Sequence, residues 1–147
     1  MKAALISLWL FVGLAGLIFH LGPGQELKRY DRVNAQMNQA RKQVSLENYS
    51  EALSSFDKAM AELPEERVDL NRKLRLEKAK TQMLNKQLPE ARLALESLMD
   101  ELMAEQLGDS ELGQETRESL ANAQYYVTWL MRLEGIPREE WEPEIEA

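Results

Sequence analysis

Two patterns of hydrophobic and polar positions divide this chain. Residues 3–19 form an apolar run without a charged side chain. From about Gln25 onward, apolar residues instead recur every three to four positions among Glu, Lys, Arg and Gln, which is typical of amphipathic helices. No segment alternates as a half-buried strand does. We therefore expect an all-α protein, with an N-terminal transmembrane helix followed by stacked antiparallel helical hairpins.

The apolar run fits a membrane-spanning helix better than a cleaved signal peptide. A span needs about 17–25 residues, whereas a signal peptide has a core of about 7–15 residues followed by small residues at the cleavage site. The bulky Ile18, Phe19 and Leu21 occupy the place of those small residues, although Gly22 and Gly24 keep cleavage as the alternative. We expect residues 1–24 to be a signal-anchor that enters the membrane through residues 3–21.

Two charge cues disagree about the orientation of this anchor. Lys2 favours an N-terminus that stays inside, so that the rest of the chain is exported. The basic residues behind the run favour a cytoplasmic position by the positive-inside rule, namely Lys28, Arg29 and Arg32. We favour export, because the N-terminus resembles a bacterial signal-anchor. The expected location is the inner (cytoplasmic) membrane, crossed once, with the helical domain periplasmic rather than cytoplasmic.

Capping and turn residues divide the remainder into five helices and a tail. Helix starts are indicated by Asn48, Pro64, Pro89 and Asp109-Ser110. Helix ends are indicated by Gly108, Gly135 and Pro137. The fifth helix is expected from about Glu115 to Glu134. The predicted helical domain covers residues 25–136, and residues 137–147 form an acidic tail or a short capping helix.

The segments 46–64 and 85–102 repeat one pattern, in which equivalent residues stand at i and i+39. Small and apolar residues coincide in the alignment, namely Ala40 with Ala79, Tyr49 with Leu88, Ala52 with Ala91, Phe56 with Leu95 and Ala59 with Leu98. Small residues allow two antiparallel helices to approach closely. Hairpins of this kind bury their apolar faces by stacking on one another.

These residues carry a family resemblance. The segment 48–53, followed by Phe56, Ala59 and Pro64, resembles the second half of a tetratricopeptide repeat (TPR), and Ala40 matches the small residue of that repeat's first helix. The resemblance covers roughly residues 33–102. It departs from the family in its i, i+39 spacing, which is longer than the usual period of about 34 residues. It also departs in Gln36, Gln39 and Gln43, which replace large apolar residues.

The resemblance implies an α-solenoid whose first helices line an inner face. In the family, that face holds extended peptides, sometimes by gripping a terminal carboxylate with Lys and Asn. Carried over to this chain, the candidate peptide-binding residues are Asn34, Asn38, Arg41, Lys73 and Lys80. The basic helix over residues 67–86 has two interpretations. It pairs with the acidic fourth helix (Glu90, Glu96, Asp100 and Glu101), or it lines a basic groove for an acidic peptide.

The fifth helix is apolar on most of its faces, which is typical of a buried helix. We favour its packing on the second hairpin. Further cover would come from Trp141 and Ile145 in the C-terminal segment, or from another protein. Tyr126, Trp129 and Trp141 are therefore a candidate assembly surface.

Composition removes several classes of chemistry. The chain has no cysteine and one histidine, His20, so neither a zinc site nor a histidine-based nucleophile pair can be assembled in the helical domain. It lacks the glycine-rich phosphate loops. A net charge of −7 argues against a nucleic-acid binder. We expect no enzyme activity, no cofactor and no metal.

After these exclusions, binding through the surface of the helical domain is the function that the sequence favours. We expect a membrane-anchored protein-interaction or scaffolding module that binds a protein or an acidic peptide at the bacterial envelope. The alternative is a non-catalytic structural or assembly subunit of a larger membrane complex. The oligomeric state is open from sequence.

Overall fold

The computed structural model describes residues 23–143, with side chains from Leu27 onward. These residues form helices and no strand, so the prediction of an all-α fold is confirmed. The helices are α2 (Pro23–Ser45), α3 (Tyr49–Glu62), α4 (Val68–Leu84), α5 (Leu88–Ala104), α6 (Glu111–Leu133) and α7 (Arg138–Trp141). The predicted membrane segment, residues 3–21, lies outside the described residues.

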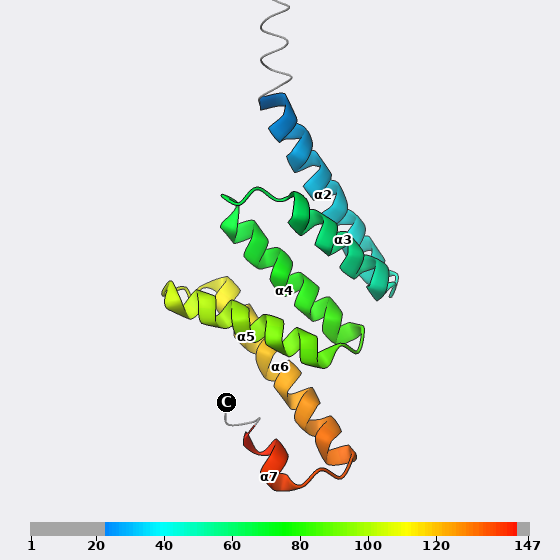
Figure 1. The fold of residues 1–147 in the computed structure, drawn as a ribbon, viewed down its shortest axis with the longest axis vertical. Coiled ribbons are helices and arrows are strands. Elements are labelled where there is room, and N and C mark those ends of the chain that lie inside the picture. The colour runs from blue at the N-terminus through cyan, green and yellow to red at the C-terminus, as the bar shows by residue number, and fades with distance from the viewer. Residues whose placement is uncertain (1–22, 144–147) are drawn as a thin grey trace, which may run out of the picture.

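The helices pack as hairpins that stack in chain order (Figure 1). α2 and α3 form the first hairpin, and α4 and α5 form the second. α3 packs on α4 between the hairpins, and α6 packs on α5. The expected packing of the fifth helix on the second hairpin is therefore confirmed. Among the helices of residues 23–143, none is both long and apolar enough to cross a bilayer.

The i, i+39 repeat is present in the structure. α3 and α5 begin at the equivalent residues Tyr49 and Leu88. The aligned small residues are buried in both hairpins, namely Ala40 and Ala52 in the first and Ala79 and Ala91 in the second. Close helix approach thus has the same cause in each hairpin. Resemblance to the TPR family itself stays a prediction.

Two buried clusters hold the stack together. The first joins α2, α3 and α4 through Val33, Met37, Ala40, Phe56, Ala59, Leu63 and Leu74. The second joins α4, α5 and α6 through Leu76, Ala79, Leu95, Leu98, Leu102 and Ala123. α4 contributes to both clusters through Leu74 and Leu76, so it links the two hairpins.

Pro64 does not begin a helix, contrary to prediction. α4 starts at Val68, and the backbone N–H of Arg67 donates to the carbonyl of Pro64 (3.0 Å) within the connecting loop. Proline favours extended backbone in the residue before it, so Pro64 marks the end of α3 rather than the start of α4. Leu63 is extended (φ −70°, ψ 131°), and the chain leaves α3 there. The prediction for Pro89 is confirmed, since it lies in the first turn of α5.

The connection from α5 to α6 also differs from the prediction. Gly108 does not end α5, because the left-handed residue after that helix is Gln106, with φ of 61°. α6 begins at Glu111, earlier than expected, and the hydroxyl of Ser110 accepts from the backbone N–H of Gly113 (3.1 Å) as an N-cap. A Cβ at Gly113 would lie 2.4 Å from the Gly108 carbonyl oxygen. Glycine is therefore required at position 113 for this close approach.

Candidate protein-binding surfaces

The candidate peptide-binding residues all lie exposed on first helices of hairpins. Asn34, Asn38 and Arg41 are on α2, and Lys73 and Lys80 are on α4. Ion pairs connect the first helices to one another. Arg41 makes two hydrogen bonds to Glu77 of α4 (2.6 and 3.0 Å), and Lys80 pairs with Glu115 of α6 (2.7 Å).

These two ion pairs are related by the repeat. Arg41 and Lys80 are equivalent residues, and each reaches a carboxylate on the next first helix along the stack. The hydrogen bond from Arg41 to Glu77 raises the pKa of Arg41, so this guanidinium stays charged. Two of the three candidate cations are thereby neutralised in place. A ligand carboxylate would have to displace Glu77 or Glu115 to use them.

Lys73 lines a small hollow between α4 and α6. The hollow has a volume of about 210 Å³ and is lined by Lys73, Leu76, Glu77, Glu111, Leu112 and Glu115. Three carboxylates therefore accompany one ammonium group. This charge balance is unfavourable for an acidic peptide.

The basic side of α4 forms ion pairs with α5. Arg72 is 3% exposed and donates to Glu101 (2.8 Å) and Glu105 (2.6 Å), and Arg75 also pairs with Glu101. The interpretation that this helix pairs with the acidic fourth helix is confirmed at Glu101. Arg72 occupies the position of Val33 in the repeat, so a charged cluster replaces an apolar contact in the second hairpin.

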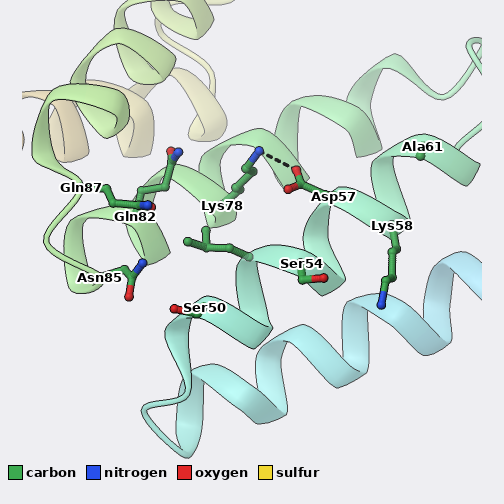
Figure 2. Close-up of a pocket in the computed structure, with 10 residues that line it drawn as sticks. Ser50, Ser54, Asp57, Lys58, Ala61, Lys78, Gln82, Asn85 and Gln87 are labelled. Carbon is green, nitrogen blue, oxygen red and sulfur yellow. Dashed lines mark hydrogen bonds and ion pairs between the residues drawn. The ribbon is translucent and has the colours of Figure 1, made fainter.

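A second, larger hollow lies between α3 and α4 (Figure 2). It has a volume of about 640 Å³, and the ion pair of Asp57 and Lys78 (2.5 Å) crosses it. Most of its lining residues have polar or charged side chains, and the buried carbonyl oxygen of the Gln82 side chain has no hydrogen-bond partner among the described residues. Sequence reasoning missed this hollow. Its signal was the polar stripe of Ser50, Ser54 and Asp57 on one face of α3.

The C-terminal half of α6 exposes large apolar side chains along one side. They are Tyr125, Tyr126, Trp129, Leu130 and Leu133, which we call the aromatic face of α6. Their exposed fractions run from 39% for Leu130 to 65% for Leu133. The rings of Tyr125 and Tyr126 meet edge to face with centroids 5.8 Å apart. The expectation that this helix is buried on most faces holds only for its other side.

The buried positions of α6 carry small residues. Thr116, Ser119, Ala123 and Thr128 are buried, and the three hydroxyls donate to backbone carbonyls of α6 itself. Small side chains let α6 lie close to α5 at Ala123. Ser119 and Ala123 stand in one row with Tyr126 and Leu130, at i, i+4, i+7 and i+11, so this row changes from small buried residues to large exposed ones along the length of α6.

α7 covers little of this surface. It has four residues, and Trp141 is half-buried beneath the guanidinium of Arg132, which lies 5.2 Å from the ring centroid. Of the candidate assembly residues, Tyr126 and Trp129 lie on the aromatic face and Trp141 lies on the neighbouring short helix. Ile145 lies outside the described residues.

Comparison of the chain with protein-family models, with curated proteins and with solved structures found no match. Within residues 23–143, no group of three or more acidic, histidine or cysteine side chains is placed to hold a metal ion. The aromatic face of α6 and the inner face of the first helices are thus the candidate surfaces, and they have different chemistry.

Proposed function

We propose that this chain is a non-catalytic protein-binding module held at a membrane, and that it contacts its partner through the aromatic face of α6. One observation carries the proposal: five large apolar side chains lie exposed along one side of a single helix. Exposed apolar patches on folded domains mark interaction sites. Tyr and Trp are also the residues that supply most binding energy in protein interfaces.

The free energy gained by burying the aromatic face is sufficient for useful binding affinity. Burying one large apolar side chain contributes about 1.5–3 kcal/mol. Several such side chains therefore offset the entropy that association costs. The inner face is less suited, because Arg41 and Lys80 are already paired with Glu77 and Glu115.

The membrane part of the proposal rests on the apolar run at residues 3–21. α2 begins at Pro23, directly after that run. Arg29 ties α2 to the end of α3 by donating to the carbonyls of Glu62 (2.5 Å) and Leu63 (3.3 Å). A run that anchors the chain would hold the domain close to the bilayer. Confinement of this kind raises the effective concentration of a weak binder.

Site-specific photo-crosslinking of the full-length chain in its own cells tests the proposal. A photoreactive residue at Tyr126 should give a discrete adduct with another protein, and Trp129→Ala should strongly reduce the yield of that adduct. The matched control is Leu46, which is similarly exposed but lies in the first hairpin. Absence of an adduct at Tyr126, or an equal adduct at Leu46, contradicts the proposal.

Permanent assembly into a membrane complex is the second candidate, because the same aromatic face suits a stable interface. Native sizing of the full-length chain after mild detergent extraction separates the two. A single-chain particle favours a transient adaptor, and a larger particle of fixed composition favours a subunit.

Reporter fusions after Ala147 test the orientation. Under the export hypothesis, an alkaline phosphatase fusion is active and a fluorescent-protein fusion is dark. Fluorescence without phosphatase activity would contradict export.

A further inference from the structure

The third hairpin of the stack lacks a full second helix among the described residues. In the first two hairpins, the first helix is covered by a second helix of 14 residues (α3) or 17 residues (α5). α6 is followed by α7, which has four residues. The aromatic face of α6 is exposed in this hairpin.

The spacing of the aromatic face suits a helical ligand. Tyr126, Trp129, Leu130 and Leu133 lie at i, i+3, i+4 and i+7, so they form one straight stripe along the axis of α6. An amphipathic helix packs such a stripe against its own apolar side. An extended peptide gains less here, because α6 offers no free backbone groups along its side.

The helices that carry and adjoin the stripe are rich in exposed acidic residues. Glu118 lies about two turns before Tyr126 on α6, Glu134 directly follows Leu133, and Glu139 and Glu140 lie on α7, which contacts α6. Among residues 23–143, no ion pair involves any of the four. The nearby cations already have other contacts: Arg138 pairs with Glu142 (2.5 Å), and Arg132 lies over the ring of Trp141.

We propose that a basic amphipathic helix of a partner protein docks along the aromatic face of α6 and takes the place of a second helix in the third hairpin. This inference rests on the proposed function and adds the chemistry of the partner. Leucine-like residues of that helix cover the stripe, and Lys or Arg at its flanks face Glu118, Glu134, Glu139 and Glu140.

A second copy of this chain fits the surface less well. A two-fold dimer would place the same stripe, with its acidic surroundings, against itself. Like charges that face each other across an interface oppose association. The basic residues of the chain are concentrated on α2 and α4, and Arg41, Arg72 and Arg75 are already paired there with glutamates.

Two designed peptides test the partner chemistry directly. Both have the length of α5, 17 residues. Both carry Leu and Ala at one helical stripe, and they differ only in Lys or Glu at the flanking positions. Fluorescence anisotropy measures their binding to the full-length chain in nanodiscs of neutral phosphatidylcholine, which does not itself attract the basic peptide. We expect the Lys peptide to bind at least about tenfold more tightly and its affinity to fall with salt. Glu139→Lys combined with Glu140→Lys brings the summed charge of the four flanking side chains to zero and should abolish the preference.

Equal binding of the two peptides, or no binding of either, overturns the inference. Peptide mapping of the Tyr126 crosslink supplies the second measurement. Adducts spaced three to four positions apart in one Lys- or Arg-flanked segment support the inference. Adducts in an acidic or extended segment, in a second copy of this chain or in lipid overturn it. An adduct with a protein of any other chemistry leaves the proposed function standing, whereas the absence of a protein adduct overturns both.

Discussion

Glu47 and Lys86 adopt the same left-handed backbone conformation, with φ of 60° and 62°, at equivalent positions of the repeat. Each follows the first helix of a hairpin. In both turns, the backbone N–H of the next residue donates to a carbonyl five positions back, from Asn48 to Gln43 and from Gln87 to Gln82 (both 2.9 Å). This is the Schellman geometry, which normally employs glycine at the left-handed position. The repeat therefore preserves a backbone conformation even though neither residue is glycine.

Glycine at these two turns should stabilise the protein. Left-handed backbone costs a residue with a Cβ about 1 kcal/mol, part of which glycine loses again through its freer unfolded chain. We expect Glu47→Gly and Lys86→Gly each to raise the free energy of unfolding by about 0.5 kcal/mol. Urea titration measures the change. Lys58→Gly, in the middle of α3, is the control and should lower stability by about 1 kcal/mol. A loss of stability at both turns would contradict the expectation.

Arg72 should tolerate an apolar replacement better than truncation. Its side chain is buried and donates to Glu101 and Glu105, so Arg72→Ala leaves a cavity, removes the cation of Glu105 and leaves Glu101 with Arg75 alone. We expect Arg72→Ala to cost about 2 kcal/mol, because the glutamates are partly solvated. Arg72→Leu should cost less, since Val33 shows that an apolar residue fits the equivalent place. Thermal unfolding compares the two, and an equal loss would argue against this account.

Stability should fall in acid through Glu101. Hydrogen bonds from Arg72, and then from Arg75, lower the pKa of Glu101 below its ordinary value of 4.5. A folded-state pKa below the unfolded one contributes stability that is present above the unfolded pKa and is lost as pH falls through the folded pKa. The urea midpoint should therefore drop between about pH 5 and pH 3. Glu101→Gln should flatten part of this decline, and an unchanged slope would contradict the role of the cluster.

Alanine variants of Trp129 and Phe56 should show separate effects on partner binding and on the stability of the fold. Trp129 is 47% exposed on the aromatic face, whereas Phe56 is buried in the first core. Trp129→Ala should change stability by less than about 0.5 kcal/mol and weaken partner binding about 30-fold. Phe56→Ala should cost about 3–5 kcal/mol of stability. Denaturant unfolding and the Tyr126 crosslink read out the two effects, and a large stability loss in Trp129→Ala would point to a core role instead.

Loss of the inner-face cations should leave binding intact. Arg41→Ala, Lys73→Ala and Lys80→Ala together remove the candidate peptide-binding charges while the aromatic face is untouched. Because Arg41 and Lys80 are exposed pairs, their removal should cost at most about 1 kcal/mol each. The Tyr126 crosslink should keep its yield. A lost adduct in a folded triple variant would return the binding site to the inner face.

The sequence by itself determined the helical class, the i, i+39 repeat and the residues that hairpins bury. Helical periodicity reflects local geometry, which one sequence is enough to predict. Close approach of helices was predicted from buried small residues, namely Ala40, Ala52, Ala79 and Ala91. The helix ends were predicted less accurately. Proline and glycine occur both at helix ends and in turns, and in the structure Pro64 and Gly108 belong to the connecting turns.

Only the tertiary structure decided which polar and apolar side chains remain available. Arg41 and Lys80 look like free cations in sequence, yet their carboxylate partners lie 36 and 35 positions away and reach them only after the hairpins stack. The fifth helix looks buried on most faces in sequence. Its contact with α5 includes the small Ala123, and Tyr126 and Trp129 stay exposed further along the helix. Both outcomes depend on which helix packs against each side of α2, α4 and α6. The periodicity of the sequence does not specify that neighbouring helix.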